Sequence, residues 1–127
     1  MKLSDIFQLA QLEPKIKDKK MSIKTTYKFT RLFKEIEEQV NFFNETLSNL
    51  IKEYGKRDEN GEFVLTENQN GVKIREDKYD ECMAKVQELN ELDPELAYTP
   101  SFALEELDNL ELSMEELNIL MPFIIED

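Results

Sequence analysis

A heptad repeat of apolar residues constrains the fold of this chain more than any other feature. From residue 29 to residue 54, large apolar residues recur at alternating steps of four and three, which keeps them in one stripe on one face of an α-helix. The stripe consists of Phe29, Phe33, Ile36, Val40, Phe43, Leu47, Leu50 and Tyr54. It predicts a helix from about Thr25 to Tyr54, longer than the typical helix of a compact domain. Three further apolar residues widen the stripe: Leu32, Phe42 and Ile51.

Glycine and proline divide the rest of the chain. All three glycines lie between residues 55 and 71, and no proline occurs between Lys15 and Asp93. Because glycine favours turns and proline interrupts helices, this distribution predicts a turn-rich insert between two helices and a broken C-terminal region. Gly55 directly follows the apolar stripe. We expect it to end the long helix in the left-handed conformation.

Two short β-prone runs in the insert predict a β-hairpin. Residues 62–65 and 72–75 are separated by a polar segment that ends in Asn70-Gly71. Asparagine and glycine tolerate the positive φ that tight connections require. A second helix is predicted from about Glu76 to Leu92, with Cys82 on its apolar face as a buried core thiol.

Short helices are predicted near both ends of the chain. Apolar residues recur at helical spacing in residues 4–14, and Thr99-Pro100 has the residue types of an N-cap and a first helical position. Ser113 and Glu116 have the spacing of a capping box. The expected fold class is therefore mainly α (α+β): a single domain of residues 1–127 whose long antiparallel helix pair is tipped by a β-hairpin and braced by short N- and C-terminal helices.

The composition argues against catalysis and metal binding. The chain has no histidine, which is the commonest general base near neutral pH and the commonest transition-metal ligand. Its single cysteine excludes an intramolecular disulfide. We expect no enzymatic activity, no metal site and no cofactor. No apolar run is long enough to cross a bilayer and no signal-peptide pattern is visible, so a cytoplasmic protein without membrane association is expected.

Charge is distributed very unevenly along the chain, whose net charge is −12. From Val86 onward there are twelve acidic residues and no lysine or arginine, whereas Lys15 to Lys34 holds eight basic residues and one acidic residue. Such a one-sign surface steers association with partners of the opposite sign. We therefore expect the C-terminal half to bind a basic surface of a partner protein. The residues expected to contact it are Glu105, Glu106, Asp108, Glu115 and Glu116, with Phe123 and Ile124 as apolar anchors.

The basic segment leaves alternatives open. Its lysines, with Tyr27 and Phe29 as stacking surfaces, have the composition of a nucleic-acid-binding segment, although the net charge of the chain repels polyanions. Otherwise these lysines solvate the start of the long helix and meet acids of the C-terminal half, within one molecule or between subunits. A homo-oligomer is also expected, because apolar residues cover more of the long helix than one partner helix would bury.

Two segments carry a family resemblance. Residues 53–64 (EYGKRDENGEFV) lie between the two expected helices, and residues 112–117 (LSMEEL) precede Pro122. Together with the helix, hairpin, helix order, they resemble a family of short uncharacterised proteins of tailed bacteriophages and prophages. The layout is also similar in outline to the hairpin-tipped coiled coils of prefoldin subunits. The resemblance assigns no activity to any residue. It implies a phage-type accessory protein in the host cytoplasm, either an inhibitor of a host nucleic-acid or defence system or an assembly or chaperone-like factor.

Overall fold

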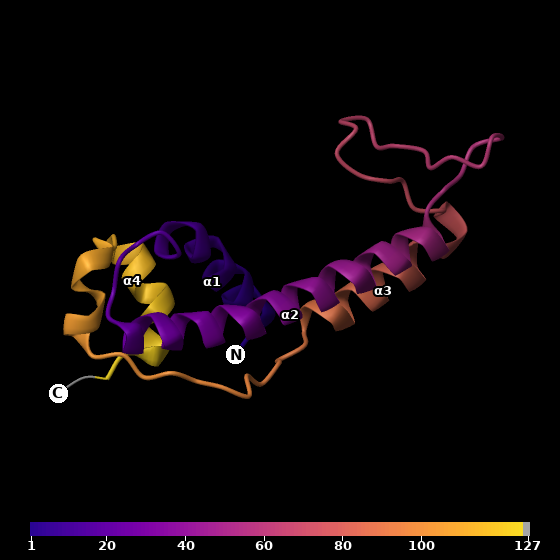
Figure 1. The fold of residues 1–127 in the computed structure, drawn as a ribbon. Helices are drawn as coiled ribbons and strands as arrows, with labels where there is room; N and C mark the ends of the chain where they lie inside the picture. Colours follow the sequence, from indigo (N-terminus) through magenta and orange to yellow (C-terminus); the bar gives the residue numbers. More distant parts are fainter. Residues whose placement is uncertain (126–127) are drawn as a thin grey trace. The chain divides into compact units, whose positions relative to one another are not determined.

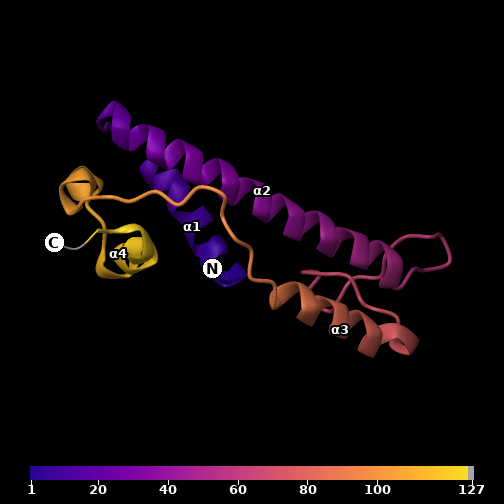
Figure 2. The same ribbon diagram turned by 90° about the horizontal axis from the view of Figure 1, so that it is seen from below.

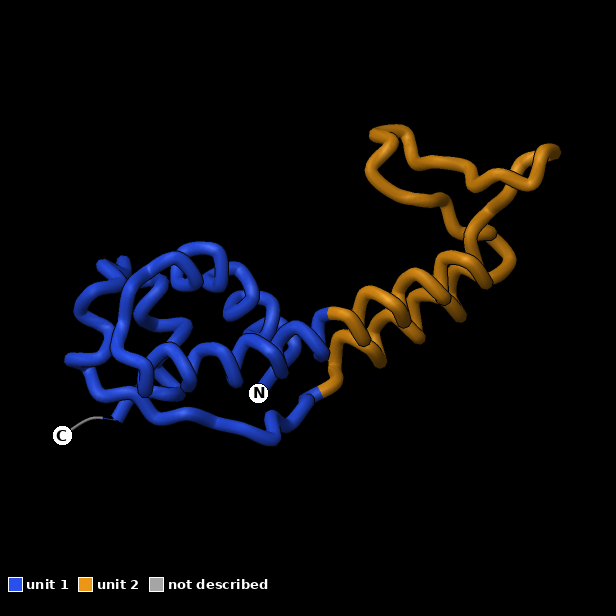
Figure 3. Tube along the Cα trace, viewed as in Figure 1, with its two compact units in different colours: residues 1–40, 93–127 blue, residues 41–92 orange. Residues whose placement is uncertain are grey.

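The computed structural model describes residues 1–125, which form helices and irregular segments (Figures 1 and 2). The chain divides into two compact units, one of residues 1–40 and 93–127 and one of residues 41–92 (Figure 3). The elements in chain order are α1 (Leu3–Ile16), α2 (Ile23–Tyr54), the 3-10 helix η1 (Glu76–Lys78), α3 (Tyr79–Asn90), the 3-10 helix η2 (Leu104–Leu110), α4 (Met114–Leu120) and the 3-10 helix η3 (Met121–Phe123).

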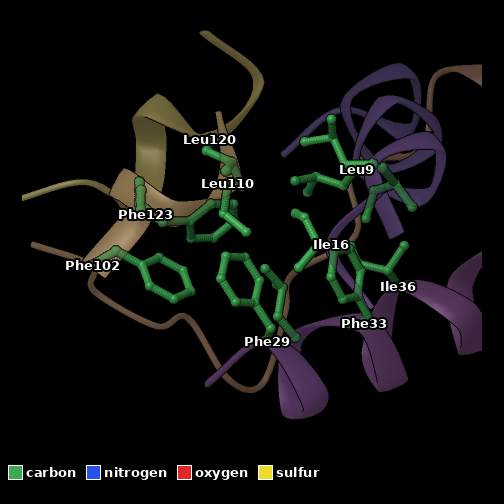
Figure 4. Close-up of a cluster of buried hydrophobic side chains, with 13 residues drawn as sticks. Leu9, Ile16, Phe29, Phe33, Ile36, Phe102, Leu110, Leu120 and Phe123 are labelled. Atoms are coloured by element: carbon green, nitrogen blue, oxygen red, sulfur yellow. The ribbon is translucent and has the colours of Figure 1, made fainter. Parts of the chain in front are cut away.

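The core of the first unit forms where α1, the first part of α2, η2 and α4 meet (Figure 4). Phe29 lies at its centre, with its ring stacked on Phe102 at a centroid distance of 4.4 Å and on Phe33 at 5.8 Å. The side chains buried there include Ile6, Leu9, Leu12, Ile16, Leu32, Ile36, Leu107, Leu110, Leu120 and Phe123. Burial of this apolar surface is the main force that holds the unit together.

A short backbone pairing closes the core at its C-terminal side. The Phe102 N–H donates to the carbonyl oxygen of Phe123 at 2.7 Å, and the Ile125 N–H donates to the carbonyl oxygen of Phe102 at 2.9 Å. This parallel bridge joins the segment before η2 to the segment after η3. It satisfies backbone groups that burial of Phe102 and Phe123 would otherwise leave unpaired.

The second unit has a smaller core. Leu50 and Tyr54 of α2 pack against Cys82 of α3, with Ile74 and Val86 at the edge. In this unit α3 lies beside the second part of α2 (Figures 1 and 2). The predicted second helix thus exists, but its first turn is η1 and its regular part, α3, has only 12 residues. Cys82 is a buried thiol, as the sequence predicts.

The predicted β-hairpin is absent, so the expected α+β fold class is wrong on this point. Among the described residues no strand or sheet forms, and residues 55–75 make only isolated antiparallel bridges. The bridges pair Gly55 with Ile74, Arg57 with Phe63, and Leu65 with Val72. The two β-prone runs are short, Leu65 is exposed and Ile74 lies only at the edge of the second core, so no continuous apolar layer supports the runs. Two short strands without such a layer are only marginally stable.

The long helix lies where the heptad repeat predicts it, but Gly55 follows it for a different reason than expected. In the described part of the chain the glycine with positive φ is Gly61, not Gly55. A Cβ atom at position 55 would lie 2.5 Å from the Ile51 carbonyl oxygen and 2.8 Å from the Phe63 ring. Glycine is required there by close approach.

Both predicted terminal helices have shifted boundaries. Helix α1 continues through Pro14 to Ile16, because the buried Ile16 side chain holds this last turn against the core. Pro100 does not start a helix. The next helix, η2, begins at Leu104 and is of the 3-10 type. The capping box of α4 is confirmed, since Ser113 Oγ accepts from the Glu116 N–H at 3.1 Å and Glu116 Oε1 accepts from the Ser113 N–H at 2.9 Å.

Candidate partner-binding site

Glu106, one of the predicted contact residues, is bound within the molecule. Its carboxylate accepts hydrogen bonds from Lys28 Nζ at 3.0 Å, Thr25 Oγ1 at 2.9 Å and the Ala103 N–H at 2.8 Å. Burial of the carboxylate disfavours its charge, but the bonds from Ala103, Lys28 and Thr25 together outweigh burial and lower the pKa of Glu106. Glu106 therefore anchors η2 to α2.

Glu116 is bound in a similar way. Its carboxylate accepts from Lys15 Nζ at 2.6 Å, in addition to the capping bond from Ser113. The bond from Lys15 and then the bond from the Ser113 N–H lower the pKa of Glu116. The pairing of the basic segment with C-terminal acids, expected as one alternative, thus occurs within one molecule for Lys15 and Lys28.

The two predicted apolar anchors belong to the fold. Phe123 has only 4 % of its surface exposed and lies among the core side chains of Figure 4. Ile124 is half-buried and packs against the same core. The sequence suggests exposed anchors because these residues sit near an acidic end, but burial against Phe102 takes Phe123 away from any partner. Ile125 is exposed.

An acidic row remains on η2. In a 3-10 helix residues three apart lie directly above one another. Glu105 and Asp108 are therefore aligned. Glu111, the C-cap residue, follows three positions later, but its backbone is left-handed (φ 51°, ψ 52°), so its side chain leaves the helical register. All three side chains are exposed. We call Glu105, Asp108 and Glu111 the acidic row. Glu111 was not among the residues predicted from the sequence, but the leucines at 104, 107 and 110 recur at steps of three, and this period indicates a 3-10 helix.

An apolar groove lies beside the acidic row. It has a volume of about 380 Å³ and contains two carboxylates of the row. Its lining residues are Leu104, Leu107, Asp108, Glu111, Leu112 and Leu117, which we call the leucine groove. Leu104 is 53 % exposed, so apolar surface is open to a partner here. A groove of this kind is suited to an apolar side chain of a partner protein that is flanked by basic residues.

Glu115 lies elsewhere. It lines a groove of about 500 Å³ between α1 and α4, where Asp5 and the amides of Gln8, Gln11 and Asn118 are also found. The five predicted carboxylates are thus not brought into one site, although Glu116 lines the same groove as Glu115. Glu105 and Asp108 lie on the acidic row, Glu115 lies between α1 and α4, and the remaining two are in ion pairs.

The basic segment offers little for base stacking. Phe29 is buried in the core, so its ring is closed to a ligand. Tyr27 is exposed, and the Arg31 guanidinium lies over its ring and over the Tyr98 ring at 5.9 and 4.1 Å. Lys17, Lys19 and Lys34 line a separate groove of about 400 Å³.

No group of three His, Cys, Asp or Glu side chains in residues 1–125 is placed to hold a metal ion. Burial raises the pKa of the Cys82 thiol, which favours the protonated form over the nucleophilic thiolate. No helix of these residues is long and apolar enough to cross a membrane.

Comparisons with known proteins add no assignment. A scan against protein-family models, a search of curated proteins and a search of solved structures each find no match. The resemblance to phage and prophage proteins therefore stays a prediction from the sequence.

Proposed function

We propose that this protein is a non-enzymatic interaction module that binds a basic, amphipathic segment of a partner protein in the leucine groove. The observation that carries the proposal is the combination of an open apolar groove with a row of exposed carboxylates beside it. From Val86 onward the sequence has no lysine or arginine, and the Lys15 ammonium that α1 brings to this end of η2 donates to the Glu111 backbone carbonyl oxygen at 3.3 Å and pairs with Glu116.

The two features act at different steps of binding. Carboxylates of one sign attract a basic partner over a Debye length of about 8 Å at physiological ionic strength and so raise the association rate. Apolar side chains that enter the groove then lose contact with water, which slows dissociation. Glu106 and Glu116 contribute indirectly, because their ion pairs with Lys28 and Lys15 hold η2 and α4 in place.

The biological setting follows from the resemblance stated for residues 53–64 and 112–117. A phage-type accessory protein that covers a basic surface acts as an inhibitor of a host nucleic-acid or defence protein, since such proteins bind polyanions with that surface. An assembly or chaperone-like role uses the same chemistry on a phage protein. The proposed compartment is the host cytoplasm.

Affinity capture from the native cell followed by mass spectrometry names the partner. Binding kinetics of the captured partner are then compared for the parent and for the triple variant Glu105→Gln, Asp108→Asn, Glu111→Gln. The variant should associate more slowly and lose most of its salt dependence, because charge is removed while side-chain shape is kept. The matched control is Glu37→Gln, Glu38→Gln, Glu45→Gln, which removes three exposed carboxylates of α2.

A second variant tests the leucine groove separately from the acidic row. Leu104→Ser shortens an exposed groove side chain and should speed dissociation with little effect on the association rate. If both variants bind the partner with the parent's rates at every salt concentration, the acidic row and the leucine groove are not the binding site.

Nucleic-acid binding is the second candidate function, favoured by the exposed lysines of the basic segment at positions 17, 19, 20, 24 and 34. The net charge of −12 opposes it. A gel-shift assay at physiological salt decides between the two, since micromolar binding to DNA or RNA would favour this second function.

A further inference from the structure

Two Asn-Gly dipeptides lie in the segment between α2 and η1, and the hydrogen bonds around them differ. Asn60-Gly61 and Asn70-Gly71 are both exposed. Asn-Gly is the dipeptide most prone to spontaneous deamidation, because glycine leaves its backbone nitrogen free to reach the preceding side-chain amide. The reaction requires that nitrogen to lose its proton and approach the asparagine Cγ. Local hydrogen bonds therefore decide which asparagine reacts.

The turn at Asn60-Gly61 holds the attacking nitrogen in place. The Gly61 N–H donates to the Asp58 carbonyl oxygen at 3.0 Å. Asp58 Oδ1 accepts from the N–H groups of Asn60 and Glu62 at 2.9 and 3.0 Å, and Arg57 donates to the Gly61 carbonyl oxygen at 2.7 Å. Moving the Gly61 nitrogen toward the side chain of Asn60 breaks this network.

The turn at Asn70-Gly71 lacks such a restraint. No hydrogen bond from the Gly71 N–H is found within residues 1–125. The turn is closed by the Thr66 N–H on the Gly71 carbonyl oxygen at 2.9 Å and by the Gln69 N–H on the Thr66 carbonyl oxygen at 2.8 Å. Neither bond involves the attacking nitrogen.

We propose that Asn70 is a site of spontaneous deamidation and that the Asp58 turn protects Asn60. The Gly71 nitrogen gives its proton to water or hydroxide and forms a bond to Asn70 Cγ, and ammonia leaves to give a cyclic succinimide. Water then opens the ring at either carbonyl, which leaves aspartate or isoaspartate at position 70. The net change is water consumed and ammonia released. A neutral residue of this loop becomes a carboxylate, and the isoaspartate product is a substrate for isoaspartate-specific protein methyltransferases.

The test compares the two asparagines in one sample. The folded protein is incubated at mildly alkaline pH, digested, and mapped by mass spectrometry, with isoaspartate measured by methyl transfer from an isoaspartate methyltransferase. Deamidation at Asn70 should exceed that at Asn60 several-fold. In denaturant the two rates should approach each other, because the hydrogen bonds at Asp58 are lost. Equal rates in the folded protein, or faster reaction at Asn60, would overturn the proposal.

Two variants test the cause of the difference. Gly71→Ala should slow the reaction at Asn70, and it fits the open space around that glycine. Asp58→Ala removes the side-chain acceptor of the Asn60 and Glu62 N–H groups. The turn that keeps the Gly61 N–H on the Asp58 carbonyl oxygen should then loosen, and the rate at Asn60 should rise toward that at Asn70. An unchanged rate at Asn60 in folded Asp58→Ala would show that the turn does not protect it, and would contradict the proposal.

Discussion

At the scale of single residues, close contacts decide which positions are sensitive to substitution. Gly55 and Gly71 make the contrast clear, because both are glycines of the same insert. The space at position 55 is filled by the Ile51 carbonyl oxygen and the Phe63 ring, while the space at position 71 is empty. Residue type alone does not distinguish them.

We expect Gly55→Ala to destabilise the protein by about 1–3 kcal/mol, the usual cost of overpacking a filled site. The added Cβ would displace the Phe63 ring and strain the end of α2. Urea denaturation monitored by circular dichroism measures the free energy of unfolding. Gly71→Ala is the control and should change it by no more than about 0.5 kcal/mol. Equal losses in the two variants would contradict the close approach at Gly55.

The ionised carboxylate of Glu106 makes the stability of the fold depend on pH. The pKa of Glu106 is lower in the folded protein than its ordinary value of 4.5. The unfolded state therefore binds the proton first, and the stabilisation is full above pH 4.5 and is lost as pH falls through the folded pKa. We expect Glu106→Gln to cost roughly 1–3 kcal/mol near neutral pH, the range for hydrogen bonds to charged groups.

Denaturation curves at neutral pH and at pH values below 4.5 check this expectation. The difference between Glu106→Gln and the parent should shrink as the pH falls. Glu105→Gln is the control, since Glu105 is exposed and no hydrogen bond involves its side chain in the described part of the chain. A loss that stays constant with pH would show that the charge of Glu106 does not stabilise the fold.

At the scale of elements, the apolar stripe of α2 is not buried uniformly. Phe29, Phe33 and Ile36 are buried in the core of the first unit, and Leu50 and Tyr54 in that of the second. The residues between them are only half-buried. Substitutions of buried residues near the two ends of α2 should therefore destabilise the protein more than substitutions in its middle.

We expect Ile36→Ala to destabilise the first unit by about 2–5 kcal/mol, because it leaves a cavity beside Phe33. Phe42→Ala, at an exposed position of the same helix, should cost much less. Thermal melting followed by circular dichroism measures both. If the two substitutions cost the same, the burial pattern of α2 is not the one described.

At the scale of the whole molecule, exposed apolar side chains bear on self-association. Ile23 is 90 % exposed and Met114 is 85 % exposed, and Tyr27, Phe42 and Tyr79 are also open to water. Singly exposed apolar side chains are common on monomers, whereas a contiguous apolar patch of more than a few hundred Å² marks an interface. The oligomer expected from the width of the α2 stripe has residues available to form its interface.

We expect a dimer or higher oligomer in solution, held by burial of these side chains. Light scattering across a broad concentration range measures its mass. Ile23→Ser should shift the equilibrium toward monomer without unfolding the chain, because its side chain makes little contact within it. A mass of 15.0 kDa at every concentration would contradict self-association.

Features that depend on neighbours along the chain could be predicted from the sequence. The heptad spacing located α2, the Ser113 and Glu116 pattern located the start of α4, and the apolar spacing around Cys82 identified a buried thiol. Each of these rests on residues one or two helical turns apart, whose interactions are fixed once the helix forms.

Which acids are free for a partner, and whether the β-prone runs pair as a hairpin, depend instead on tertiary contacts. Glu106 pairs with Lys28 across 78 positions, and Glu116 with Lys15 across 101. From the sequence Phe123 is predicted to be an exposed anchor, but in the structure it is buried in the core with Phe102. The β-prone runs of residues 62–75 lack a packing layer to make them a hairpin. Contacts between distant residues set these outcomes, because desolvation and ion pairing depend on which side chains the fold brings together.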